Sequence, residues 1–179
     1  MLGYVCKYTP MELFEAMDTE ITRLEPSVTD FNHADTLMHA NICSYTKAVL
    51  EDVMEHDYEG FILTTCCDSI RRLYDTLKSQ FPDKFFFLLD IPRKFNDFAV
   101  ALYERQLKQM LTEYEAFSGK TLDLKRFVSM MQNKAALKKQ ENTRMSSSAV
   151  SEKGNGQKLN IGIMGARCNN EIRQLLVDR

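Results

Sequence analysis

The sequence predicts an α/β protein in which a parallel sheet is flanked by helices, and three observations lead to this fold class. Short apolar or β-branched runs alternate with longer segments in which apolar residues recur every three or four positions, the pattern of strand–helix–strand units. Residues 85–89 are apolar throughout, as expected for a strand covered by helices on both faces. The composition, 44% hydrophobic and 27% charged with 7 Gly and 4 Pro, is typical of a globular chain and excludes collagen-like or wholly disordered proteins.

Four strands are expected in the first half of the chain, at residues 3–7, 20–24, 61–65 and 84–89. The last of them contains three phenylalanines followed by two leucines. Because this run is apolar on both faces, it is predicted to lie at the centre of the sheet.

Five helices are expected, at residues 10–17, 41–55, 67–80, 95–117 and 122–140. Pro10 suits a first helical turn, where its missing N–H donor is not needed, and Gly119 suits the end of the fourth helix. In that helix, apolar side chains recur at helical spacing and are predicted to pack in the core: Phe98, Leu102, Leu107, Met110, Leu111, Tyr114 and Phe117.

The composition changes after residue 140, and this change predicts three regions. Residues 1–140 are expected to form an α/β domain with a helical extension, and residues 141–158, rich in Ser, Asn, Gly, Lys and Glu, a flexible linker. Residues 159–179 read as a strand, a loop and a helix. One strand and one helix cannot make a core, so this tail either adds to the first sheet or begins a second α/β half.

Charge and hydropathy exclude several classes of partner. The formal net charge is -2, so no basic excess favours nucleic acid or a membrane surface. The longest apolar run, residues 85–89, is far shorter than the roughly 20 residues that span a bilayer, and the amino terminus lacks a signal pattern. A cytoplasmic protein is expected. The five cysteines, an odd number in a chain of this size, favour reduced thiols over disulfides.

The cysteines are the residues whose expected positions point to chemistry. Cys66 and Cys67 follow a predicted strand at its carboxyl end, where open α/β sheets bind ligands, and no C-x-x-C pair occurs. A helix amino terminus stabilises a thiolate, and Cys43, near the start of the preceding helix, could face the same crevice. Two thiolates from separate loops suit a metal or an iron–sulfur cluster. The alternative is that they are ordinary buried cysteines, since free Cys is among the most often buried residue types.

Other polar residues give weaker indications. Asp68 with Arg71 and Arg72 is expected to cap and pair within one helix, and the alternative is phosphate binding by either arginine. Gly162 and Gly165 lack the spacing and the lysine of a nucleotide-binding loop. No paired metal spacing occurs among the three histidines, which are expected in core or solvent positions: His33, His39 and His56.

Several ordered blocks resemble one family. These are GYVCKYTPMELFEAM at residues 3–17, NICSYTKAVLED at 41–52, GFILTTCCDSIRRLYDTL at 60–77 and the segment from LLDIPRKF at 88 to 122. They are similar to successive blocks of the 2-hydroxyacyl-CoA dehydratase family, the 2-hydroxyglutaryl-CoA dehydratase D-component family, which includes benzoyl-CoA reductase subunits. The resemblance extends over residues 1–140. Members of this family are about twice as long as the present chain, so the resemblance implies a truncated member.

The resemblance implies two flavodoxin-like halves with a 4Fe-4S cluster between them, held by three cysteines. Cys43, in a block resembling C-x-Y-x-K, and Cys67, in one resembling T-x-C-D, match the first and second ligands. The third ligand belongs to the second half of the family's chain and is not found here. Cys66 and Cys168 inherit no role, and no catalytic residue is assigned.

The resemblance also implies a function. An ATP-dependent iron–sulfur activator protein donates one electron to an oxygen-sensitive enzyme of anaerobic metabolism, which then eliminates water from a 2-hydroxyacyl-CoA by a radical mechanism. The partner is a homologous second subunit, and the present chain is expected to be inactive alone. Two alternatives stay open: a cluster-free α/β interaction module or remnant that pairs with a full-length subunit, and a benzoyl-CoA reductase-like or double-cubane-type reductase subunit.

Overall fold

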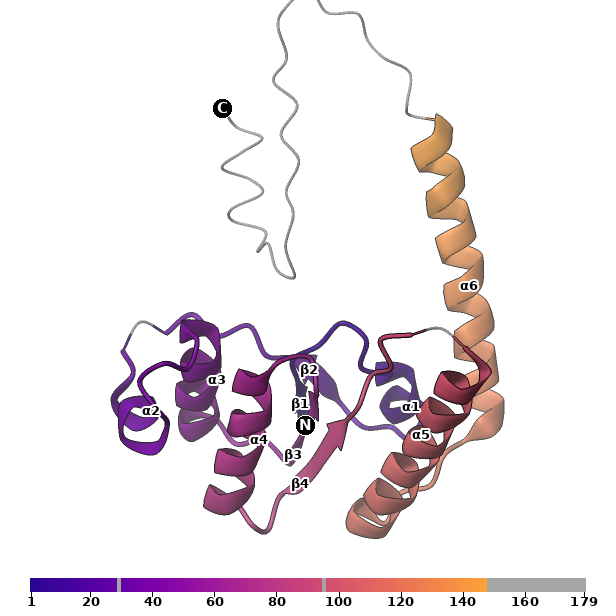
Figure 1. Ribbon diagram of the computed structural model, residues 1–179. Helices are drawn as coiled ribbons and strands as arrows, with labels where there is room; N and C mark the ends of the chain where they lie inside the picture. The colour runs from indigo at the N-terminus through magenta and orange to yellow at the C-terminus, as the bar shows by residue number, and fades with distance from the viewer. Residues whose placement is uncertain (29, 95, 148–179) are drawn as a thin grey trace, which may run out of the picture. The chain divides into compact units, whose positions relative to one another are not determined.

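The computed structural model describes residues 1–28, 30–94 and 96–147, and within them a four-stranded parallel sheet is flanked by helices (Figure 1). The predicted fold class is therefore confirmed. The strand order β2-β1-β3-β4 matches the start of the flavodoxin-like arrangement. The strands are β1 (Leu2–Tyr4), β2 (Ile21–Arg23), β3 (Gly60–Thr64) and β4 (Phe85–Leu89).

Helices cover both faces of the sheet, so the strands have a core on each side (Figure 1). One face packs against α2 (Asn32–Leu37), α3 (Ser44–Glu55) and α4 (Asp68–Gln80), and the other against α1 (Met11–Glu15) and α5 (Asp97–Ser118). Successive residues of β3 alternate between the two cores: Phe61 and Leu63 face the first, and Ile62 faces the second. The double coverage explains why β3 and β4 are apolar along their whole length.

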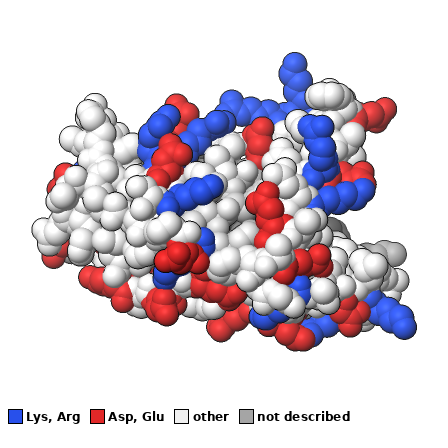
Figure 2. Space-filling view, turned by 90° about the horizontal axis from the view of Figure 1, so that it is seen from below, with Lys and Arg blue, Asp and Glu red and all other residues white. Residues whose placement is uncertain are grey.

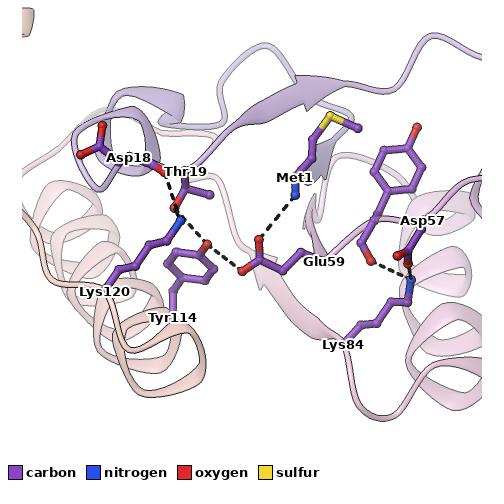
Figure 3. Close-up of polar contacts among 9 residues, drawn as sticks. Met1, Asp18, Thr19, Asp57, Glu59, Lys84, Tyr114 and Lys120 are labelled. Carbon is purple, nitrogen blue, oxygen red and sulfur yellow. Dashed lines mark hydrogen bonds and ion pairs between the residues drawn. The ribbon is translucent and has the colours of Figure 1, made fainter.

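A network of polar side chains lies at the end of the sheet where the strands begin (Figure 3). The Tyr114 hydroxyl lies 3.0 Å from Thr19 Oγ1 and donates to Glu59 Oε1 at 3.1 Å. Glu59 also pairs with the Met1 amino group at 3.5 Å, and Lys120 Nζ donates to Thr19 Oγ1 at 3.1 Å. These contacts tie the carboxyl end of α5 to the starts of three strands. Cys6, Cys66 and Cys67 follow the carboxyl ends of β1 and β3, at the opposite end of the strands.

The prediction that residues 85–89 form the centre of the sheet is wrong. In the described part of the chain β4 pairs with β3 alone and lies at the edge. A strand is apolar on both faces when helices pack above and below it, as α4 and α5 do here. Such a run does not indicate whether strands lie on both sides of it.

The core stripe predicted for α5 is correct in part. Met110 and Tyr114 are fully buried, but Phe98 is 78% exposed and Phe117 is 44% exposed. The two residues differ, because the Phe117 ring still contacts Phe85 and Tyr114, with ring centroids 5.6 Å and 6.4 Å apart. Gly119 ends α5 in the left-handed conformation with φ 71°, as its position in the sequence predicts.

The final helix is longer than predicted, and one helix was not predicted. Helix α6 (Leu124–Ser147) continues through the first seven residues of the expected linker. The rest of that linker, residues 148–158, and the expected second half, 159–179, lie outside the described residues. Helix α2 is short and has few apolar residues, so periodicity gives no signal for it.

Charge is unevenly distributed along the chain. Residues 1–123 contain 21 Asp and Glu against 12 Lys and Arg, whereas residues 124–147 contain one Glu against six Lys and Arg. In Figure 2, acidic side chains gather mainly toward the lower edge of the face shown. No helix in the described ranges has the length and apolar character needed to cross a bilayer.

Candidate functional site

Cys43 and Cys67 each precede the first residue of a helix on the same face of the sheet. Cys43 is the N-cap of α3, with φ −63° and ψ 147°, and Cys67 is the N-cap of α4, with φ −156° and ψ 165°. Both are exposed. Because the first backbone N–H groups of a helix have no intrahelical acceptor, an N-cap side chain lies where negative charge is stabilised.

Several hydrogen-bond donors act on the Cys43 sulfur. Its Sγ lies 3.0 Å from the hydroxyl oxygen of Thr46, a fully buried residue on the first turn of α3. Partial burial raises the pKa of Cys43, but the hydroxyls of Thr46 and Ser69 and the backbone of Thr46 and Tyr45 lower it, and the net shift is downward. The thiolate of Cys43 is therefore favoured.

Ser69 connects the two cysteine positions. It lies in the first turn of α4, two residues after Cys67, and its hydroxyl acts on the Cys43 sulfur. The structure thus brings Cys43 to the amino terminus of α4. Residues at the starts of α3 and α4 therefore lie close together.

The sulfur of Cys66 has a different environment from that of Cys43. Burial raises the pKa of Cys66, and its interactions with Cys67 and Cys6 act in the same direction, while a contact with the Thr64 hydroxyl opposes them. The net pKa shift is upward, so the neutral thiol is favoured. The influence of Cys6, which follows β1, indicates that its side chain lies on the same side of the sheet as Cys66.

The same edge of the sheet contains polar contacts that the sequence did not indicate. The Thr65 hydroxyl donates to the Asp90 carboxylate, joining the loops after β3 and β4. Gln106 on α5 holds the second loop, because its Oε1 accepts the Asp90 amide at 2.8 Å and its Nε2 donates to the Asp90 carbonyl at 3.2 Å. Thr65 and Asp90 follow strands directly, a recognisable signal, whereas nothing in the sequence distinguishes Gln106.

The histidines make local structural contacts. His33 Nδ1 lies 2.7 Å from Glu51 Oε2, His39 Nδ1 accepts the amide of residue 41 at 3.1 Å, and His56 Nδ1 lies 2.9 Å from the carbonyl oxygen of Asp52. In the described ranges no three His, Cys, Asp or Glu side chains lie close enough together to hold a metal ion.

The charged residues at the start of α4 pair along their own helix. Arg71 Nε lies 4.0 Å from Asp68 Oδ1, and Arg72 donates to Asp75 at 3.1 Å. Pairing within the helix is confirmed for Arg71, while the partner of Arg72 is Asp75 rather than Asp68. Such contacts are ordinary for exposed helical surfaces.

The cysteine pair fits part of the donor set of an iron–sulfur cluster. Thiolates are the usual protein ligands of such clusters, and the lowered pKa of Cys43 favours the thiolate form. Cys67 supplies a second thiol at the neighbouring helix terminus. A third ligand is absent from the described residues around this pair. Cys168 lies outside the described residues.

Comparison with known proteins identifies one matching family. A family model described as 2-hydroxyglutaryl-CoA dehydratase, D-component, matches residues 6–159. The matched range includes both cysteines and the helices that they cap. A search of curated proteins gave no match.

Proposed function

The chain belongs to the 2-hydroxyglutaryl-CoA dehydratase D-component family, and on this basis we propose that it is an iron–sulfur subunit of a 2-hydroxyacyl-CoA dehydratase-like enzyme. The observation that carries the proposal is the pair of helix N-cap cysteines, with Cys43 favoured as a thiolate and the α4 terminus beside it. The proposal assigns Cys43 and Cys67 as two ligands of a 4Fe-4S cluster.

The chain's own residues would hold the cluster and stabilise its charge. Cys43 and Cys67 would ligate it, and the helix amino termini behind them would stabilise its negative charge. When bound, the cluster would supply one-electron chemistry at low potential. The third ligand would come from outside the described residues or from a partner.

The proposed reaction follows the family. The substrate would be a 2-hydroxyacyl-CoA that loses water after one-electron reduction, the electron would come from an ATP-dependent iron–sulfur activator protein, and a homologous second subunit would complete the enzyme. A benzoyl-CoA reductase-like or double-cubane-type member would use the same cysteines. Product analysis separates the two, because a dehydratase releases an unsaturated acyl-CoA and a reductase adds electrons to its substrate.

The test is anaerobic reconstitution of the full chain with iron and sulfide, followed by iron, sulfide and electron-resonance analysis. Wild type is expected to bind a cluster, and Cys43→Ser and Cys67→Ser are each expected to lose most of the bound iron. Cys66→Ser is the matched control, because it removes an adjacent exposed thiol to which no ligand role is assigned. Equal iron in wild type and both ligand variants would refute the assignment.

An exposed apolar stripe on α6 supports a second candidate function, a cluster-free module that pairs with a homologous subunit. Leu124, Val128 and Met131 recur at helical spacing and are 66%, 50% and 43% exposed. The helix is strongly basic in sequence, while residues 1–123 are strongly acidic. A homologous subunit with a similarly acidic body would therefore complement α6 in charge.

Association with such a subunit can be tested independently of iron. Co-expression with a full-length homologous subunit, followed by size-exclusion chromatography, is expected to give a complex with wild type. A Leu124→Asp/Val128→Asp variant is expected to abolish it. Val100→Asp, at another half-exposed valine on α5, is the control. If the α6 variant still forms the complex, this surface is not the contact between the subunits. If wild type elutes alone, the chain does not pair with the homologous subunit.

A further inference from the structure

We infer that Thr46 is a positioning residue that donates a hydrogen bond to the Cys43 sulfur and thereby raises the reduction potential of the cluster assigned to this site. The inference rests on the proposed function, since it concerns the cluster that Cys43 would hold. It adds a residue to which neither the family match nor the sequence motif assigns a role.

The contact is short, and its hydroxyl partner is buried although Cys43 itself is exposed. Thr46 Oγ1 lies 3.0 Å from Cys43 Sγ, and Thr46 is 0% exposed. A helical threonine often bonds back to the carbonyl oxygen four residues earlier. Here the hydroxyl instead lies beside the N-cap sulfur three residues earlier. Because Thr46 is completely buried, few other positions are open to this hydroxyl.

Ligation determines the direction of the hydrogen bond. Either atom can donate while the cysteine carries its proton. A cysteine that ligates iron has lost its proton, so the sulfur can then act only as an acceptor and the Thr46 hydroxyl must donate. A hydroxyl in a buried position interacts more strongly with a charged sulfur than one in water does.

Such a hydrogen bond affects electron transfer. Reduction adds negative charge to the cluster and its ligand sulfurs, and a donor aimed at a sulfur stabilises the reduced state more than the oxidised state. The reduction potential is therefore less negative with the hydroxyl than without it. Ser69, from α4, adds a second hydroxyl at the same sulfur.

The experiment compares midpoint potentials of anaerobically reconstituted full-length variants by redox-poised electron resonance. Thr46→Val removes the hydroxyl but keeps the branched shape that fills the buried site, and Thr46→Ser keeps the hydroxyl. Thr112→Val on α5 is the control, because its hydroxyl bonds the Lys108 carbonyl and contacts no cysteine. Thr46→Ala serves as a second hydroxyl-free variant if Thr46→Val does not fold.

A more negative potential in Thr46→Val or Thr46→Ala, with wild-type potentials in Thr46→Ser and Thr112→Val and equal iron in all variants, is the expected result. A wild-type potential in the hydroxyl-free variants at full iron content would overturn the inference and leave the proposed function intact. A wild-type protein that binds no cluster would overturn the proposed function, and the inference with it.

Discussion

At the scale of single residues, the surroundings of each sulfur determine its reactivity. Cys43 is bounded by hydroxyl and amide donors, whereas Cys66 is partly buried beside two further thiols. The pKa of Cys43 is lowered and that of Cys66 is raised, so at neutral pH Cys43 has the larger thiolate fraction. Both side chains reach solvent, so a small reagent can approach either sulfur.

We expect iodoacetamide to alkylate Cys43 faster than Cys66 in the metal-free, reduced chain at pH 7. The measurement is peptide mapping by mass spectrometry over a time course. Thr46→Val should slow the reaction at Cys43 and leave the rate at Cys66 unchanged. A faster reaction at Cys66 would contradict the assigned environments.

A second residue-scale prediction concerns Glu51, a carboxylate that is 4% exposed on α3. Its Oε1 accepts the Ala34 amide at 2.8 Å and its Oε2 lies 2.7 Å from His33 Nδ1. Burial raises the pKa of Glu51, but the contacts with Ala34 and His33 lower it, and the net shift is below the ordinary value of 4.5. The ionised form is thus the one that the folded chain stabilises.

The pH dependence follows from that direction. The stabilising contribution of Glu51 is fully present above pH 4.5 and is lost as the pH falls through the lowered value of the folded state. Glu51→Gln should reduce the free energy of unfolding at pH 7 by about 1–3 kcal/mol. The difference from wild type should shrink on acidification, as urea titrations at pH 7 and pH 3 would show. An equal difference in the free energy of unfolding at the two pH values would show that the charge of Glu51 does not contribute to stability.

At the scale of elements, two glycines should respond differently to the same substitution. A Cβ on Gly60 would lie 2.4 Å from the Phe85 carbonyl oxygen, so Gly60→Ala must push β3 and β4 apart. We expect a loss of about 3 kcal/mol or more, comparable with other severe packing errors in a core. Thermal or urea unfolding measures the effect.

Gly119→Ala is the matched comparison. Gly119 has φ 71° and nothing within 4 Å of an added Cβ, so its cost comes only from the left-handed backbone. About 1 kcal/mol is expected. If Gly60→Ala lowered the free energy of unfolding no more than Gly119→Ala does, β3 and β4 could not approach each other as closely at Gly60 as described.

At the scale of the whole molecule, α6 contacts the rest of the domain through Phe127, which packs against the second core, and through ion pairs with α1 and the loop after it. Arg126 bonds the Asp18 carboxylate, and Lys134 Nζ lies 3.1 Å from Glu12 and 3.3 Å from Glu15. These pairs are partly exposed, so each contributes little and is screened by salt.

Amide hydrogen exchange in residues 124–137 should therefore accelerate between 0.1 M and 1 M sodium chloride, roughly the range over which the Debye length falls from about 10 Å to about 3 Å. Exchange in β3 should not change, because its hydrogen bonds lie between two apolar cores. Mass spectrometry of peptic fragments provides the measurement. Salt-independent exchange in α6 would show that apolar packing, chiefly by Phe127, holds the helix.

The sequence predicts the fold better than it predicts the surroundings of the site. The strands and main helices are marked by local periodicity, and the N-cap position of Cys67 follows from the order of strand and helix. The position of β4 in the sheet depends on pairing between distant segments, which periodicity does not record. In helix α2 the Ala34 amide donates to Glu51, 17 residues further on, and no local pattern could reveal this contact.

The same limit applies to the site. The motif around Cys43 gives its place in the family pattern, but the contacts that change its pKa come partly from Ser69 on another helix. Thr46 is close in sequence, yet its burial and the direction of its hydroxyl depend on how α3 packs. A residue that acts on a site from another helix can be identified only from the three-dimensional structure.

The position of β4 also affects how the protein must be handled. In the described part of the chain, one side of Phe85–Leu89 has no neighbouring strand, and such an edge can recruit the same segment of another molecule. Lys84 and Asp90 flank the run with opposite charges, as gatekeeper residues do in aggregation-prone sequences. Neutralising both should favour fibrous or amorphous aggregates during refolding, with light scattering rising at concentrations that wild type tolerates.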